Sequence, residues 1–214
     1  MTAQAQRTAP LEREWLLRTL LVLQRPRAVF AALRDDDDAG AAARQEPMTA
    51  LVLLAGVAGV LSTSVAGHLL DDPDFDGLLV AVWAFLGGGV YGIAAYWLLG
   101  ALVYGAAYAF GGLGSYRRAR HVVGFAAAPL ALSLFILWPI GIAAFGGDLF
   151  RSGGSDGGNG GGVFTLAQLA FGAWAATLLV IGVRAVHGWT RLRSLAVVAL
   201  ALAPVALLVL VERL

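Results

Sequence analysis

Residues 78–110 read LLVAVWAFLGGGVYGIAAYWLLGALVYGAAYAF, a run of 33 residues without a charged side chain. A helix rises about 1.5 Å per residue, so this run would form a helix of about 50 Å. The hydrocarbon core of a bilayer is about 30 Å thick, and crossing it takes about 20 apolar residues. The run is therefore long enough for one membrane span with an overshoot, and short for two spans and a turn.

The composition of the whole chain agrees with this interpretation. Of the 214 residues, 59% are hydrophobic and 14% are charged, against about 25% charged in an ordinary soluble domain. The mean hydropathy is +0.76. Such a chain has too few polar groups to solvate the surface of a soluble protein, and its apolar content also excludes a disordered one. We expect an all-α integral membrane protein.

Further apolar stretches predict additional spans. The expected transmembrane helices cover about residues 48–70, 78–110, 122–145, 163–183 and 192–211. Each is long enough, or nearly so, to cross the hydrocarbon core. The sequence therefore predicts a five-transmembrane-helix bundle over residues 48–214, preceded by a polar N-terminal segment, residues 1–47.

The arginines favour five spans over six. With one span at 78–110, the N-terminal segment, residues 111–121 and residues 184–193 lie on one side and carry 13 of the 15 arginines. A hairpin within 78–110 would place the two later arginine clusters on the opposite side from the first. Basic residues concentrate on the cytoplasmic side of membrane proteins. We expect a multi-pass protein of the cell membrane with its N-terminus in the cytoplasm and its C-terminus outside.

The N-terminal segment predicts an amphipathic helix. Leu16, Leu17, Leu20 and Leu21 recur at helical spacing, and Arg18 lies off that stripe. This pattern is typical of a helix lying in the membrane interface. Packing of the same helix on the ends of the bundle is an equal alternative.

Two loops carry weak motifs. In the acidic run Asp71–Asp76, the residues Asp72, Asp74, Asp76 and Gly77 match the first half of a calcium-binding loop that would begin at Asp72, but its twelfth position is Trp83 instead of Glu. We expect a solvated acidic turn, and a weak cation site stays open. The glycine-rich residues 153–162 have no phosphate-loop pattern and predict a flexible tether.

Small residues and one proline predict how the helices pack. Gly88, Gly92 and Gly100 would admit a neighbouring backbone closely, and Pro129 would kink the third span. Tyrosines 96, 104 and 108 continue the glycine spacing of four. This Gly/Tyr ridge predicts helix packing, with a substrate groove as the sharper alternative.

The residues that carry most enzyme chemistry are absent. The chain has neither cysteine nor lysine, and its predicted spans contain no Asp, Glu or Arg away from their ends. Thiolate and Schiff-base chemistry are excluded, and proton relays are disfavoured. His121 and His187 are expected at the membrane surface. We predict a non-enzymatic protein without catalytic, cofactor or metal sites.

The arginine clusters are the predicted functional face. They would bind anionic lipid headgroups or a cytoplasmic protein partner, and not nucleic acid, because they lie at membrane level. A homo-oligomer stays open. The candidate residues are Arg117, Arg118, Arg120, Arg184, Arg191 and Arg193.

Several short motifs resemble the Yip family, the Ypt/Rab-GTPase-interacting membrane proteins with five spans. Leu23–Phe30 is similar to the cytoplasmic segment of the family, in which a proline is followed by a phenylalanine. Gly111–Tyr116 and Gly124–Pro129 resemble its glycine-rich turn and its entry to the third span. Gly182–His187 looks like its fourth-to-fifth connection. The resemblance implies the five-span fold and its topology.

Eukaryotic members of the family are tied to Rab GTPases and vesicle traffic. This lysine-free, alanine- and arginine-rich chain looks prokaryotic, and its N-terminal segment is short. We therefore carry over the fold and not GTPase binding. The expected function is that of a scaffold or membrane-organising factor, and the alternative is a small-solute transporter or channel.

Overall fold

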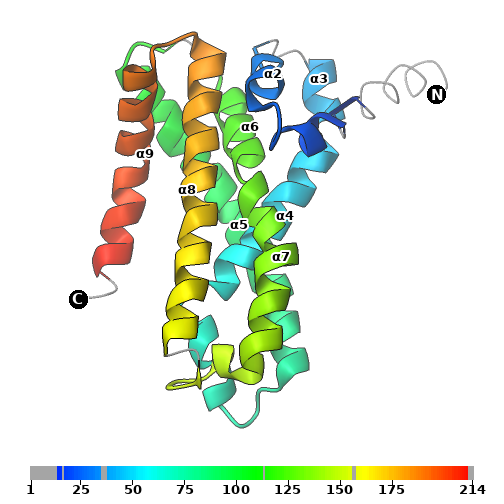
Figure 1. The fold of residues 1–214 in the computed structure, drawn as a ribbon. Coiled ribbons are helices and arrows are strands. Elements are labelled where there is room, and N and C mark those ends of the chain that lie inside the picture. Colours follow the sequence, from blue (N-terminus) through cyan, green and yellow to red (C-terminus); the bar gives the residue numbers. More distant parts are fainter. Residues whose placement is uncertain (1–13, 16, 35–37, 113, 156–157, 212–214) are drawn as a thin grey trace, which may run out of the picture. The chain divides into compact units, whose positions relative to one another are not determined.

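The computed structural model describes residues 14–15, 17–34, 38–112, 114–155 and 158–211. Within these ranges the chain forms helices and turns and no strand (Figure 1). The α-helices are α2 (Pro26–Ala31), α3 (Asp38–Ala43), α4 (Gln45–Leu61), α5 (Gly77–Ala109), α6 (Tyr116–Ala126), α7 (Ala128–Phe145), α8 (Asn159–His187) and α9 (Arg191–Val211). Two 3₁₀ helices, η1 (Ala66–Asp71) and η2 (Gly146–Phe150), lie in the connections.

Three helical stretches are long and apolar enough to cross a membrane: Gly77–Ala109, Tyr116–Phe150 and Gly160–His187. Large apolar side chains on α5 are exposed, among them Phe85 and Val90. Water would make that exposure costly, whereas lipid tails accept it. The protein is a multi-pass, all-helical membrane protein. The prediction that residues 78–110 form one helix is confirmed, since α5 runs unbroken through almost the same residues.

The first predicted span, 48–70, is wrong at its end. Helix α4 is 17 residues long and stops at Leu61. Two hydroxyls follow, and both turn back on the helix: Ser62 Oγ donates to the carbonyl of Ala58, and Thr63 Oγ1 donates to that of Val60. Such bonds compete with helix propagation. The remaining residues form η1 instead.

The third predicted span, 122–145, is divided. Helix α6 ends at Ala126 and α7 begins at Ala128. Pro129 occupies the first turn of α7, where a missing N–H leaves no helical hydrogen bond unmade. Pro129 therefore lies at the interruption within the Tyr116–Phe150 helical stretch, in the span where the sequence predicted a kink.

The fourth and fifth predicted spans, 163–183 and 192–211, correspond to α8 and α9. Helix α8 starts at Asn159 and includes the last three glycines of the expected tether, so the flexible-tether prediction is wrong for residues 160–162. The chain leaves α8 at Gly188, whose φ of 69° is the left-handed conformation that glycine adopts at helix ends. Helix α9 follows after a short turn.

The chain divides into two compact units. Unit 1 comprises residues 1–49, 95–126 and 176–214, and unit 2 comprises residues 50–94 and 127–175. Helices α4, α5 and α8 contribute a segment to each unit.

Unit 2 is built around close contact of α4 and α5. A Cβ placed on Gly88 would lie 2.5 Å from the Cα of Val57, and one on Gly92 would lie 2.4 Å from the carbonyl oxygen of Val52. On α4, a Cβ on Gly56 would lie 2.1 Å from the carbonyl oxygen of Gly88. Real Cβ atoms do not approach so closely, so these glycines allow the two backbones to touch. An aromatic cluster of Trp138, Phe150 and Phe164 packs nearby in the same unit.

Unit 1 contains the described part of the N-terminal segment. Residues 14–15 and 17–21 are helical, and Trp15 is buried with its ring stacked on Phe125 of α6 at 5.7 Å between centroids. Phe30 of α2 is fully buried, and its ring lies against Gly182 of α8. In contrast, Leu17, Leu20 and Leu21 are exposed. Leu16 of the predicted stripe lies outside the described residues.

Candidate functional site: the arginines of unit 1

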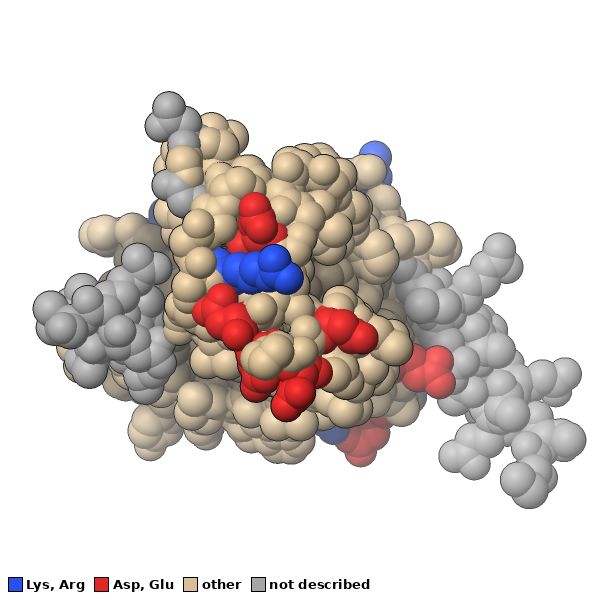
Figure 2. All heavy atoms as spheres, turned by 90° about the horizontal axis from the view of Figure 1, so that it is seen from below, with Lys and Arg blue, Asp and Glu red and all other residues tan. Residues whose placement is uncertain are grey.

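Charge is divided between the units. Of the arginines within the described ranges, all except Arg151 belong to unit 1. Unit 2 instead holds a set of acidic residues: Asp71, Asp72, Asp74, Asp76 and Asp148. Figure 2 shows that the face seen from below is mainly acidic, with only a small basic area among the carboxylates. The basic side chains of unit 1 therefore form the candidate functional surface.

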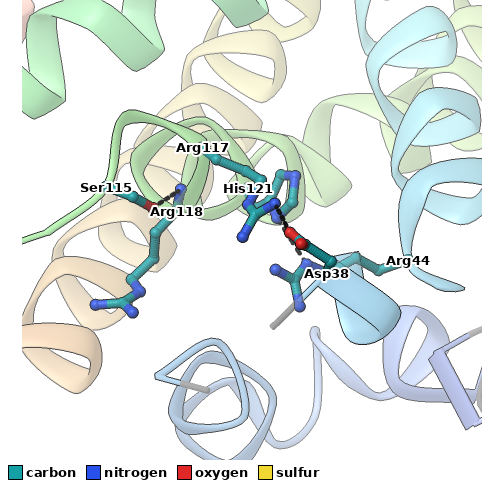
Figure 3. Close-up of polar contacts among 6 residues, drawn as sticks. All are labelled: Asp38, Arg44, Ser115, Arg117, Arg118 and His121. Carbon is teal, nitrogen blue, oxygen red and sulfur yellow. Dashed lines mark hydrogen bonds and ion pairs between the residues drawn. The ribbon is translucent and has the colours of Figure 1, made fainter. Parts of the chain in front are cut away.

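Arg117 and Arg118 open α6 (Figure 3). Arg117 forms an ion pair with Asp38 of α3 at 2.7 Å, and the Asp38 carboxylate is almost fully exposed. An exposed pair of this kind contributes little to stability. The backbone N–H of Arg118 donates to Ser115 Oγ at 3.1 Å, which caps the helix.

Arg44 is the buried arginine of the unit. It is 1% exposed, and its Nε donates to Nδ1 of His121 at 2.6 Å (Figure 3). A guanidinium is always protonated, so the imidazole must accept at Nδ1 and carry its proton on Nε2. The Trp15 ring lies 5.3 Å from the guanidinium carbon. The prediction that His121 is a membrane-surface residue is wrong, because His121 is 2% exposed.

Arg120 lies among aromatic rings. Its guanidinium carbon is 3.7 Å from the Trp97 ring centroid and 5.0 Å from that of Tyr116. The Tyr116 hydroxyl in turn donates to the Trp97 carbonyl at 2.8 Å. Gly100 makes room for this arrangement, because a Cβ there would lie 2.3 Å from Arg120 Cγ. Arg120 therefore joins α5 to α6 and is only partly available to a ligand.

Arg193 closes the turn between α8 and α9. It donates to the carbonyl oxygen of Phe110, and its guanidinium lies 4.2 Å from the Trp189 ring centroid. The Trp189 ring is also stacked with the His187 ring, at 4.3 Å between their centroids. Gly112 fits against the same pair, since a Cβ there would lie 2.9 Å from Trp189. Arg193 thus fixes the turn after α5 to the turn after α8.

Arg184 lies apart from the α6 arginines. It lines an open groove of about 330 Å³ together with Arg27 and Arg34. Arg34 Nε donates to the carbonyl oxygen of Ala185 at 2.7 Å. Arg191 is exposed at the start of α9.

The six arginines predicted as one basic face therefore have different surroundings. Arg117, Arg120 and Arg193 contact groups of the protein itself, and Arg118 lines a small cavity with residues of α5 and α8. Arg184 faces a groove, and Arg191 is exposed. The sequence predicted that the N-terminal arginines lie on the same side as Arg184. It did not predict that Arg27 and Arg34 line one groove with Arg184, because tertiary folding brings these distant segments together. The sequence also did not single out Gly56 as the residue of α4 that faces Gly88.

In unit 2, the Gly/Tyr ridge is packed against α4. Gly88 and Gly92 face the backbone of α4, which leaves no room for a solute there. In unit 1, the hydroxyl of Tyr96 lies 3.4 Å from the sulfur of Met48. Tyr108 is 70% exposed. These surroundings favour the packing interpretation of the ridge over the substrate groove.

The acidic loop of unit 2 is held by its own hydrogen bonds. Asp71 accepts hydrogen bonds from the backbone N–H and the hydroxyl of Ser152, and these bonds lower the pKa of the Asp71 carboxyl. Asp76 caps α5 by accepting from the N–H of Leu79. Among the described residues, no group of three or more His, Cys, Asp or Glu side chains could hold a metal ion. Asp71 therefore joins its loop to the segment around Ser152, and Asp76 caps the helix that follows its own loop.

Comparison with protein families gives one result. A family model described as Yip1 domain matches residues 20–212. No match is found among curated proteins, and none among solved structures.

Proposed function

Because the chain belongs to the Yip1-domain family of membrane proteins, we propose that it is a non-enzymatic scaffold or membrane-organising factor, and a prokaryotic member of the family. Its arginine-rich face contacts anionic lipid headgroups on the cytoplasmic side of the cell membrane. A cytoplasmic protein with an acidic surface is the competing partner for the same face. The proposal rests chiefly on one observation, the concentration of the described arginines in unit 1.

The proposed topology has five spans. Helix α9 is 21 residues long and would cover about 32 Å, which matches the hydrocarbon core. Helix α4 is shorter, with 17 residues covering about 26 Å, so we propose that the bilayer thins locally around it. The N-terminus then lies in the cytoplasm and the C-terminus outside, in accord with the positive-inside rule.

The N-terminal helix supports contact with the membrane surface. Trp15 of this helix and Val22, just after it, are buried. On the other side, Leu17, Leu20 and Leu21 are exposed. We propose that this second side enters the interface between headgroups and acyl chains. Such a helix binds through its apolar area together with attraction between basic residues and anionic lipids.

The test is the lipid that accompanies the protein. Extraction of the protein from its native membrane in polymer-bounded discs, followed by lipid mass spectrometry, is expected to show enrichment of anionic lipids over the bulk membrane. Discs that hold an unrelated five-span protein of neutral surface charge are the control. An unenriched lipid shell would contradict the proposal, as would solute flux in proteoliposomes, which would indicate a transporter.

A further inference from the structure

The groove that contains Arg184 is formed by two elements of unit 1. Helix α2 and the turn after it contribute Arg27 and Arg34, and the end of α8 contributes Arg184. Ile181 and Trp189 form apolar parts of its wall. At about 330 Å³, the groove is at the lower end of the size range of small-ligand sites, about 300–1,000 Å³. It therefore has room for a ligand with a charged group and an apolar part.

The three guanidinium groups are not neutralised by the described part of the protein. The ion pairs recorded among described residues join Arg18 to Glu14 and Arg117 to Asp38, and none involves the groove. Guanidinium groups stay protonated, so three positive charges surround one space. Their mutual repulsion is relieved when an anion enters.

The geometry of the groove suits a phosphate group. Arginine presents planar, forked donors that match phosphate oxygens. The bond from Arg34 Nε to the Ala185 carbonyl holds that guanidinium in place, and its terminal nitrogens remain to donate. A preorganised arginine loses less side-chain entropy when it binds.

The position of the groove favours a lipid as the source of the phosphate. It lies at the last turn of α8, a helix long and apolar enough to cross a membrane. The end of a span lies at the level of the headgroups, where tryptophan is also enriched. Basic residues near the membrane surface attract anionic headgroups.

We propose that Arg27, Arg34 and Arg184 form a binding site for the phosphate of an anionic phospholipid headgroup, with Trp189 and Ile181 against its apolar part. The site deepens the proposed function, on which it rests, because it assigns the anionic-lipid contact to one groove instead of to the whole basic face. Arg117, Arg120 and Arg193 have a different role here, since they contact the protein itself.

Single arginine variants test this assignment. Full-length protein in detergent is titrated with phosphatidylglycerol and, separately, with phosphatidylcholine of the same acyl chains, and bound lipid is counted by native mass spectrometry. Each of Arg27→Ala and Arg184→Ala is expected to weaken phosphatidylglycerol binding about fivefold, and the double variant about 25-fold. Arg191→Ala is the matched control, because Arg191 is an exposed arginine of the same unit outside the groove. It is expected to change binding less than twofold.

The outcomes separate this proposal from the broader one. If the wild type prefers phosphatidylglycerol but Arg191→Ala weakens binding as much as the groove variants do, the groove assignment is wrong and the basic face survives. If the wild type shows no preference for phosphatidylglycerol, both proposals fail. Displacement of the lipid by millimolar inorganic phosphate would overturn the lipid as the source. Arg27 is exposed, so Arg27→Ala keeps the test valid even if Arg184→Ala lowers the yield of folded protein.

Discussion

At the scale of single residues, the buried hydrogen bond from Arg44 to His121 should contribute to the stability of the folded protein. A buried charge that loses an acceptor pays its desolvation cost, about 1–3 kcal/mol or more. We expect His121→Ala to lower the thermal unfolding midpoint in detergent by roughly 2–10 °C. His121→Gln, whose side-chain carbonyl can accept from the guanidinium, should recover part of that loss.

The control for this prediction is His68→Ala. His68 is exposed, and its ring nitrogen Nδ1 lies 2.6 Å from the Ser64 carbonyl oxygen one turn earlier. Its replacement should leave the midpoint within about 1 °C, since exposed positions contribute little. Equal losses in the two alanine variants would show that the Arg44–His121 contact has no special weight.

A second residue-scale prediction concerns pH. The Ser152 hydrogen bonds lower the pKa of Asp71 from its ordinary value of 3.8. A lowered pKa means that the bonds favour the ionised carboxylate, so their contribution is complete above pH 3.8 and is lost as the pH falls through the lower, folded value. Hydrogen exchange of the Ser152 amide should therefore be faster in Asp71→Ala than in the wild type at pH 7.

That difference should disappear at pH values below the folded pKa of Asp71. Asp74→Ala is the control, because Asp74 is an exposed acid of the same loop. Its side-chain carboxylate forms no hydrogen bond or ion pair with the described residues. It should not change exchange at Ser152 at either pH. A wild-type amide that exchanges at the same rate as in Asp71→Ala at pH 7 would show that the bonds do not protect the loop.

At the scale of the elements, the α4–α5 contact depends on missing side chains. An alanine at Gly88 would place its Cβ 2.5 Å from the backbone of Val57, so one helix has to move. Overpacking of this kind costs about 1–3 kcal/mol. We expect Gly88→Ala to lower the unfolding midpoint by roughly 2–10 °C.

The same helix offers the matched control. A Cβ on Gly105 meets no atom within 4 Å. Alanine stabilises a helix interior by up to about 1 kcal/mol relative to glycine, so Gly105→Ala should leave the midpoint unchanged or raise it. A fall of the same size in both variants would place the cost in the α5 backbone and not in its contact with α4.

The elements also show how far sequence reasoning reaches. The uncharged run 78–110 predicted α5 to within one residue at each end, because length and the absence of charge determine a membrane helix. The first span was drawn nine residues beyond the end of α4, because hydropathy treats Ser62 and Thr63 as tolerable although their hydroxyls end the helix. Gly88 and Gly92 were identified by their spacing. The sequence did not predict that Gly100 would face Arg120, which depends on where α6 returns along α5.

At the scale of the whole molecule, the five-span topology predicts where each loop lies. The chain has no cysteine, so single cysteines can be introduced without background. A membrane-impermeant maleimide should label Asp74→Cys in intact cells, whereas Ser115→Cys and Thr190→Cys should react only after permeabilisation. Labelling of Ser115→Cys from outside would overturn the single span at α5 and the orientation together.

The sequence alone could not identify the residues that bind a partner, because they come from distant parts of the chain. Charge counting identified the basic segments of the chain, but the groove needs Arg27 and Arg34 from its beginning and Arg184 from near its end. No periodicity joins such distant positions. The alternative partners could therefore be ranked from the sequence, whereas the residues that recognise them required the folded chain.

The burial of the N-terminal segment has a consequence for biosynthesis. Its contacts join residues far apart in the chain, with a sequence separation of 77 between Arg44 and His121 and of 151 between Arg34 and Ala185. At about 5–20 residues per second, the ribosome needs roughly 8–30 s after Arg34 to deliver its partner. During that interval Trp15 and Phe30 have no α6 or α8 to cover them. Trp15 and Phe30 therefore reach their final surroundings only after most of the later helices have been made.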